Sequence, residues 1–297
     1  MATTRNFTSS YSGEDVQGYI LKALLGGETW STGGVSIEER VKYKKAIKRL
    51  ASSNVVTAAN CDFTATGTTT IDERILEPKD IQVNAQTCVY DYKDLWGDSL
   101  EDSIAETNEA IVQEFVNQIA LELEEATWQG NATGSTGTIK DLVDGFEKIM
   151  ADDGAVAVTA TTLSKSNIIA ELDKVVDAIP SAVMKKGKDA LVIFVSHKAA
   201  TFLEQALAAQ GVNRNNSESY QSIYGIEVRG VGGLSSDNVM AAGARDNFYF
   251  ATDIMSDMND VKILDMRDLD GSDNLRFKFA ASFDVQIGWV EETVLYS

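Results

Sequence analysis

Residues 98–129 read DSLEDSIAETNEAIVQEFVNQIALELEEATWQ and contain neither proline nor glycine. Apolar residues recur at helical spacing, and acidic residues occupy the opposite face. The apolar stripe consists of Ile104, Ile111, Phe115, Ile119 and Leu123, and the acidic face of Glu101, Asp102, Glu106, Glu109, Glu114, Glu122 and Glu125. The pattern predicts one long amphipathic helix over residues 98–128.

Both ends of this helix carry matching signals. Asp98 or Ser99 can cap its start, where the helix dipole also favours the acidic first turn. Gly130 and Asn131 follow the last turn and are suited to stop the helix. About 30 residues at about 1.5 Å each span about 45 Å, which is longer than a small domain requires. We therefore expect a beam that supports other elements.

The composition is that of an acidic chain large enough to bury a core. It has 297 residues, 44% of them hydrophobic, and a formal net charge of −19 from 45 acidic and 26 basic residues. Length alone predicts one or two domains. The charge disfavours a protein that grips nucleic acid, because phosphate binding requires clustered Lys and Arg.

One basic run interrupts the acidic chain between residues 42 and 49. It consists of Lys42, Lys44, Lys45, Lys48 and Arg49. A solvated or partner-facing strip is the simplest interpretation, and such a strip also suits contact with an acidic copy of the same chain. We predict that these five residues make inter-subunit contacts, and that the Glu residues of the long helix form the partner face.

The N-terminal part has too little apolar surface for a core of its own. Residues 1–34 are polar and rich in Gly, Ser and Thr, and predict a disordered tail or an arm that packs elsewhere. We predict that Phe7, Tyr11 and Trp30 contact adjacent subunits. Residues 35–76 predict a hairpin-like excursion with β propensity and few large core residues. Isolated hairpins are marginal in water, so we expect this one to lie on a neighbouring subunit.

Targeting and disulfide signals are missing. Residues 1–10 have no apolar segment of a signal peptide, and no run of about 18 apolar residues predicts a membrane span. Cys61 and Cys88 form neither a CxxC motif nor a disulfide framework. Reduced thiols in a cytoplasm are the expected state, and a single pairing remains geometrically open.

From residue 163 onward the pattern changes to alternating helices and strands. Residues 163–179 predict an amphipathic helix that ends at Pro180. The apolar run ALVIFV at residues 190–195 predicts a buried strand, and Ser196 can cap a following helix through Ala209. Further strands are predicted at 226–231, 248–251 and 261–266, and a terminal strand pair at 275–283 and 285–296.

Motifs of catalysis, metal binding and nucleotide binding are weak. His197 is the only histidine, so histidine-based metal sites are excluded; it is a general base or, more simply, a locally bonded helix start. Residues 230–233 follow a strand but lack the last Gly of GxGxxG, and no P-loop is present. Residues 268–273 resemble a calcium loop with its Gly misplaced, which leaves a surface cation or a polar turn. We predict no catalytic residue, metal or cofactor.

Several stretches carry a family resemblance in the same order along the chain. Residues 61–96, with Cys61, Gly67 and the run IDERILEPKD at 71–80, look like the return strand of an extended loop and the approach to a spine helix. The run WQGN at 128–131 and DGF at 144–146 are similar to the end of that helix. Residues 190–200 and 276–296 resemble strands of an axial and a peripheral domain. In these stretches the chain resembles the major capsid proteins of tailed bacteriophages, whose fold is named for phage Hong Kong ninety-seven and recurs in encapsulin shells.

This resemblance implies an α+β phage major capsid fold in four parts. The parts are an N-terminal arm over residues 1–34, an extended β-loop over about 35–76, a peripheral domain with the long spine helix over 77–140 and 272–297, and an axial α/β domain over 141–271. No scaffolding segment precedes the arm, so scaffolding would come from a separate protein, which Met1 favours, or from a part that proteolysis removes.

The resemblance also implies a structural function without an enzymatic one. The chain would assemble into hexamers and pentamers of an icosahedral capsid that encloses double-stranded DNA without binding it specifically. Its location would be the virion, after assembly in the host cytoplasm and without a membrane. Its partners would be itself and, in addition, portal, scaffolding and decoration proteins. The alternatives are an encapsulin-type nanocompartment and a soluble α/β enzyme that would depend on His197.

Overall fold

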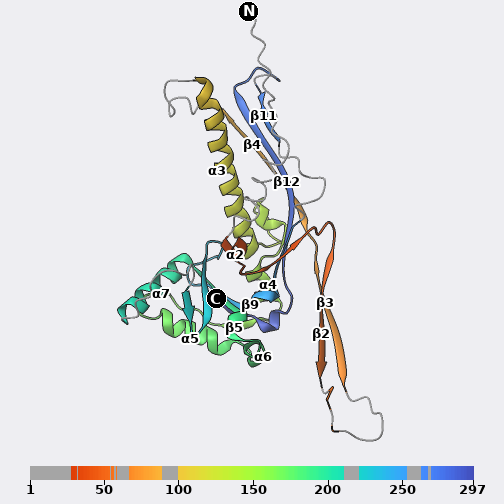
Figure 1. Cartoon of the computed structure of the whole chain (residues 1–297), viewed down its shortest axis with the longest axis vertical. Coiled ribbons are helices and arrows are strands. Elements are labelled where there is room, and N and C mark those ends of the chain that lie inside the picture. Colours follow the sequence, from red (N-terminus) through yellow and green to blue (C-terminus); the bar gives the residue numbers. More distant parts are fainter. Residues whose placement is uncertain are drawn as a thin grey trace, which may run out of the picture.

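The long helix is the beam that the sequence predicts. The computed structural model describes residues 28–31, 33–53, 55–56, 58, 67–88, 100–210, 221–252, 262–266 and 269–297. Helix α3 runs over Leu100–Gln129 and stands along one side of the molecule (Figure 1). Ile119 and Leu123 of the apolar stripe are buried, while Glu122 on the other side is exposed. The predicted caps Asp98 and Ser99 lie outside the described residues.

A close backbone contact ends this helix. The N–H of Gly145 donates to the carbonyl oxygen of Gly130 at 2.9 Å. A Cβ on Gly130 would lie 2.5 Å from the carbonyl oxygen of Val143, so no larger residue fits there. The predicted stop at Gly130 is thus confirmed, and its cause is tertiary packing.

The five-stranded sheet lies along α3 and is organised around one long strand. Strand β12 (Asn274–Ile287) pairs antiparallel with β4 (Lys79–Cys88), β10 (Phe248–Thr252) and β11 (Lys262–Asp265). Strand β1 (Ser36–Glu39) adds to β10 in parallel. The ring of Phe115 on α3 lies 5.5 Å from that of Phe277 on β12, so the helix covers one face of this sheet.

The six-stranded sheet forms the second body and has helices beside it. Its order is β5 (Val156–Val158), β13 (Val294–Tyr296), β9 (Met240–Ala244), β6 (Leu191–Ser196), β8 (Ile226–Val231) and β7 (Gln221–Ile223). Helices α5 (Ile168–Ala178) and α7 (His197–Ala209) pack against it, with the short α6 (Ser181–Met184) nearby (Figure 1). Ser196 Oγ accepts the N–H of Ala199 at 3.1 Å, which confirms the predicted cap.

A two-stranded hairpin projects from the molecule. Strand β2 (Lys45–Ser53) pairs antiparallel with β3 (Thr68–Leu76), and the hairpin reaches beyond both sheets (Figure 1, lower right). The predicted excursion therefore exists. Strand β1, inside the same predicted range, belongs instead to the five-stranded sheet.

Four buried aromatic rings join the two sheets and the long helix. Trp128 of α3 lies edge-on to Phe194 of β6 at 5.0 Å and to Phe146 of α4 (Phe146–Asp152) at 5.3 Å. Phe248 of β10 contacts Phe146 at 5.3 Å and Phe194 at 5.5 Å. All four residues are fully buried, so this cluster ties the helix and both sheets into one core.

The predicted terminal strand pair is wrong. Residues 274–287 form one strand of 14 residues, because Asp284 is the only residue between Phe283 and Val285 and a β-turn needs at least two central residues. The chain then passes through the short helix η6 (Val290–Glu292) and ends as β13 in the six-stranded sheet.

Strand pairing also differs from the domain boundaries that the resemblance implies. Residues 294–296, assigned to the peripheral domain, pair in the six-stranded sheet. Residues 248–252 and 262–265, assigned to the axial domain, pair with β12 in the five-stranded sheet. The reason is that partners distant in sequence decide to which sheet a strand belongs.

Candidate assembly surfaces

The residues considered for chemistry do not gather into a site. His197 is the exposed first residue of α7, and the Gly233 loop packs on the backbone of α3. Asp270 Oδ1 accepts hydrogen bonds from the N–H and hydroxyl of Ser272 at 2.9 and 2.6 Å, which makes a polar turn before β12. Among the described residues no group of acidic, His and Cys side chains has a metal-binding arrangement. None of the described helices is both long and apolar enough to cross a membrane.

The hairpin carries an exposed apolar face. Directly opposed residues of paired strands share a face, and successive residues alternate between faces. On one face Leu50 lies opposite Ile71, and Ala46 lies opposite Ile75. Leu50 is 67% exposed, Ile71 68% and Ile75 47%. Between the two pairs, Lys48 lies opposite Glu73 on the same face. We call the four apolar residues the apolar hairpin face; the described chain leaves it largely uncovered.

The opposite face anchors the hairpin to its own subunit. Ile47 and Leu76 on this face are buried in a small cluster with Val41 and Ala251. Trp289 packs against the same cluster. The base of the hairpin is therefore fixed, while its far half is free to contact another molecule.

Three of the five basic residues that we predicted to contact another subunit form ion pairs within their own chain. Lys44 Nζ lies 2.7 Å from a carboxylate oxygen of Glu77, and Lys45 pairs with Glu38. The guanidinium of Arg49 lies 3.2 Å from Glu292, 3.5 Å from Glu291 and 5.1 Å from the centre of the Trp289 ring. These residues stabilise the base of the hairpin in its own subunit.

Lys42 and Lys48 differ from the other three. Both side chains are exposed, and neither forms an ion pair with any residue that the structure describes. The hypothesis of a basic strip that meets a neighbouring acidic face therefore narrows to Lys42 and Lys48.

Trp30 was predicted to contact an adjacent subunit, but the structure buries its side chain within its own subunit. Its side chain is 1% exposed and stacks on Phe250, with ring centres 4.4 Å apart. Beside it, the hydroxyl of Thr29 accepts the indole N–H of Trp128 at 2.7 Å and donates to Glu124. A neighbouring subunit cannot reach Trp30, which we therefore remove from the predicted inter-subunit contacts. Phe7 and Tyr11 lie outside the described residues, so their contacts stay predictions.

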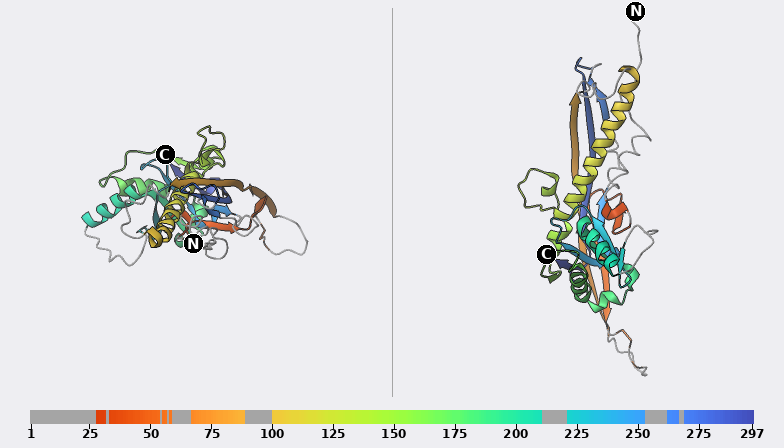
Figure 2. Two further views of the ribbon diagram at one scale, coloured as in Figure 1. Left: turned by 90° about the horizontal axis from the view of Figure 1, so that it is seen from above. Right: turned by 90° about the vertical axis from the view of Figure 1, so that its left-hand side faces the viewer.

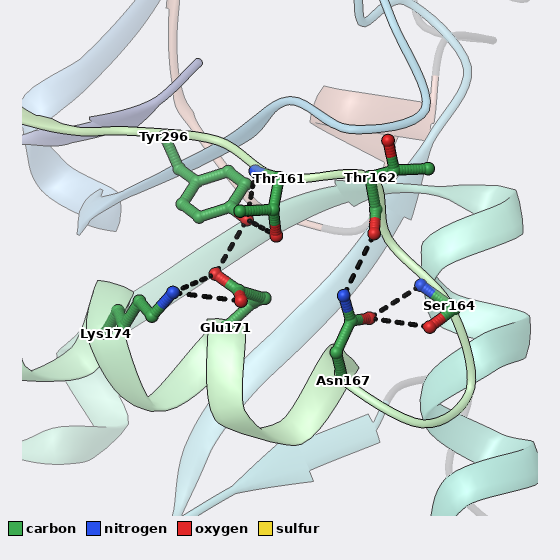
Figure 3. A network of polar contacts seen from close by, with 7 residues as sticks. All are labelled: Thr161, Thr162, Ser164, Asn167, Glu171, Lys174 and Tyr296. Atoms are coloured by element: carbon green, nitrogen blue, oxygen red, sulfur yellow. Dashed lines mark hydrogen bonds and ion pairs between the residues drawn. The ribbon is translucent and has the colours of Figure 1, made fainter.

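A polar network fastens the end of the chain to the six-stranded sheet. The hydroxyl of Tyr296 donates to Glu171 of α5 at 2.9 Å and accepts the N–H of Thr161 at 2.9 Å (Figure 3). Lys174 Nζ binds both carboxylate oxygens of Glu171 at 2.7 and 2.9 Å. The network is structural, because it holds β13 and α5 together around the buried Glu171.

Asp284 links the base of the hairpin to β12. Its carboxylate accepts the backbone N–H of Glu77 at 2.6 Å and that of Val285 at 2.8 Å. Burial raises the pKa of Asp284 from 3.8 to about 6, and these hydrogen bonds offset the rise only in part. The folded protein therefore holds this proton more tightly than the unfolded chain does.

The stabilising contribution of the Asp284 proton should be fully present below about pH 4 and lost as the pH rises through about 6. Asp284→Asn keeps one acceptor oxygen but replaces the other with an amide NH2, so it loses one of the two backbone hydrogen bonds at every pH, at a cost of about 0.5–1.5 kcal/mol. Relative to the wild type, we expect the variant to gain up to about 3 kcal/mol of stability between about pH 4 and neutral pH. Thermal unfolding of unassembled subunits across this pH range measures the difference. The exposed Asp189→Asn is the control, and equal pH profiles for both variants would contradict the prediction.

Comparison with known proteins places this architecture. No protein-family model matches the sequence, and no curated protein matches it. A chain of the satellite phage P4 procapsid that includes the size determination (Sid) protein is 15% identical, with a TM-score of 0.59 over 99% of this chain and 93% of that chain. The capsid of cyanophage A-1(L) is 13% identical, with a TM-score of 0.54 over 91% and 92%. The chain has the phage capsid fold.

The phage capsid fold is also found in a particle that is not described as a phage. The virus-like particle from Pyrococcus furiosus is 9% identical, with a TM-score of 0.54 over 95% of this chain and 98% of that chain. The α+β fold class predicted from the sequence is thus confirmed.

Proposed function

We propose that this chain is the major capsid protein of a tailed phage, a structural protein that assembles into hexamers and pentamers of an icosahedral shell. The observation that carries the proposal is the hairpin, because its exposed apolar side chains would not stabilise a monomer. Its base is fixed by Ile47 and Leu76, while Leu50 and Ile71 stay largely in water. Burial of each such aliphatic side chain contributes about 1.5–3 kcal/mol, so a neighbouring copy that covers them would be bound.

In this proposal the protein functions through its contacts with other subunits and catalyses no reaction. A shell repeats the same interfaces many times, so weak contacts suffice once closure multiplies them. A net charge of −19 would repel packaged DNA, which would be enclosed without specific binding. Portal, scaffolding and decoration proteins are the further partners in this proposal, and the virion is its location after assembly in the host cytoplasm.

The four-part division is proposed with altered boundaries. The arm would end near residue 34 and the extended loop would comprise β2 and β3. The peripheral domain would comprise α3 with the five-stranded sheet, and the axial domain the six-stranded sheet with its helices. Residues 294–296 would then belong to the axial part.

Electron microscopy of the purified, full-length protein tests the function. We expect closed shells, or hexameric and pentameric rings, because the hairpin needs a neighbour to bury its apolar face. A stable monomer at high protein concentration would contradict the proposal and favour the soluble α/β enzyme.

A second candidate is an encapsulin-type shell that holds a protein cargo. The likeness to the virus-like particle from Pyrococcus furiosus, with a TM-score of 0.54, favours it. Particles produced with the remaining proteins of the same genome would distinguish the two. Packaged double-stranded DNA supports the phage capsid, and shells that enclose only protein support the nanocompartment.

Charge reversal tests the remaining basic contacts. Lys42→Glu with Lys48→Glu should weaken assembly at low salt and less so at high salt, because salt screens exposed charges beyond about 10 Å at 0.1 M. Lys165→Glu with Lys185→Glu changes the same charge at exposed positions elsewhere and serves as the control. Particle yield by sedimentation is the measurement; equal yields for both variants at every salt concentration would exclude these two contacts.

A further inference from the structure

A groove runs between helix α3, the first half of β4 and the loop that follows the helix. It has a volume of about 970 Å³. The groove is lined by residues 80–83 of β4, residues 118, 119, 121, 122 and 125 of α3, and residues 136–140 and 142 of the loop. Figure 2 (right) shows α3 and β4 side by side, with the loop near their lower ends. No part of the described chain fills this groove.

The β4 side of the groove is an unpaired strand edge. Strand β4 pairs with β12 along its whole length, and no other described strand pairs with it. In an antiparallel pair, alternate residues direct their N–H and C=O groups away from the partner. Over residues 80–83 the groove therefore offers backbone donors and acceptors to another extended chain.

The floor of the groove is apolar and partly uncovered. Ile81 and Ile119 are buried beneath it, and Val83 is half-buried. Leu121 on α3 is 60% exposed and Leu142 on the loop 39% exposed, and both line the groove. Two exposed leucines beside an open strand edge can take up apolar side chains of an added strand.

The rim of the groove is acidic. Lys140 is its one described cation and is already bound to Glu125 at 2.7 Å and to the side-chain oxygen of Gln129 at 2.9 Å. Glu122 accepts only the amide of Gln118 at 3.0 Å, and Asp80 has no cationic partner among the described residues. Two carboxylates thus remain available for Lys or Arg side chains of a bound segment.

We propose that this groove binds an extended segment of a different protein, which adds to the edge of β4 as a strand. The face of the segment towards α3 would carry apolar residues that meet Leu121 and Leu142, and its other face would carry Lys or Arg residues on the side of Asp80. A basic residue at one end of the segment would lie near Glu122. Backbone hydrogen bonds would supply affinity, and the apolar and acidic positions would supply specificity.

A partner other than a second copy fits the charges best. The chain's own basic extended segment is β2, but Lys45 and Arg49 of that strand already pair with Glu38 and Glu292. Lys48 is left, opposite Glu73 in the hairpin. Among the three basic residues of β2, Lys48 is therefore the one without an ion pair to a described residue.

Binding of labelled heptapeptides to the full-length protein tests the proposal by fluorescence anisotropy. The probe is KVKLKVK, which alternates basic and apolar residues. A version with N-methyl groups on alternate backbone nitrogens keeps the charge but cannot form the ladder. We expect saturable binding of the probe and at least about tenfold weaker binding of the N-methylated peptide, since the strand edge supplies the affinity.

Matched protein variants separate the groove from the general acidic field. Glu122→Lys should weaken binding of the probe at least about tenfold, whereas Glu114→Lys, the same change on an exposed position of α3 outside the groove, should change it less than about twofold. Leu121→Asp should weaken it as Glu122→Lys does.

Three results would overturn the proposal. They are equal effects of Glu122→Lys and Glu114→Lys, equal affinity of the two peptides, and binding by unassembled subunits that disappears in assembled particles. The last result would assign the groove to a neighbouring copy. The peptide affinities can be measured on unassembled subunits. The test of the groove therefore remains valid even if the protein fails to form shells.

Discussion

Leu50→Asp together with Ile71→Asp should yield a folded subunit that no longer closes into shells. The two side chains lie directly opposite each other on the apolar hairpin face and are 67% and 68% exposed. Within the subunit the change therefore costs little, because exposed substitutions usually shift stability by about 0.5 kcal/mol or less. At an interface it places two carboxylates where apolar surface would be buried, which costs several kcal/mol at every copy.

The matched control uses the same strand and the opposite face. Thr68→Asp with Thr70→Asp introduces the same charge on exposed positions next to Ile71. We expect this control to form particles and both variants to unfold at nearly the same temperature. Sedimentation and electron microscopy measure assembly, and normal particles from the Leu50/Ile71 variant would show that this face is not an interface.

Trp30→Ala should lower the free energy of unfolding by about 3–5 kcal/mol, as expected for loss of a buried large aromatic side chain. The indole is 1% exposed and stacks on Phe250 at 4.4 Å. The indole N–H of Trp128 donates to the hydroxyl of neighbouring Thr29 at 2.7 Å, so the substitution also loosens the contact between residues 29–30 and α3.

Tyr43→Ala is the control for this prediction, because Tyr43 is an aromatic residue nearby in sequence that is 83% exposed. Denaturant unfolding of unassembled subunits should separate the two variants clearly. Equal midpoints would mean that Trp30 is not part of its own subunit's core, and would restore the earlier prediction of a contact with a neighbour.

The sequence by itself determined the elements whose causes are local. The apolar period of residues 98–129 determined α3, and Ser196 before an apolar run determined the start of α7. The alternation around Ile81 and Val83 determined one face of β4. In each of these, neighbours within a few residues supply the hydrogen bonds or the pattern. The uncovered hairpin was predictable for the same reason, since its lack of core residues is a property of its composition.

Sequence reasoning missed elements whose pattern is weak or whose partner is distant. Strand β9 (MAAGA) is fully buried between β13 and β6. Its small residues show neither the polar and apolar alternation nor the large side chains by which a strand is predicted from sequence. The groove beside β4 was missed as well, because its walls come from three separate segments. Exposed Leu121 on the acidic side of α3 was the only signal in the sequence that pointed to it.

Only the tertiary structure decided where these elements go. Strand β1 joins β10 at Ser36↔Tyr249, and the chain ends in the six-stranded sheet at Val294↔Ala242, pairings that no local pattern encodes. The tertiary structure also decided that Trp30 belongs to the core and that Lys44, Lys45 and Arg49 form ion pairs within their own subunit. The physical reason is that residue type fixes what a side chain can bind, whereas the long-range packing of strands fixes which partner is within reach.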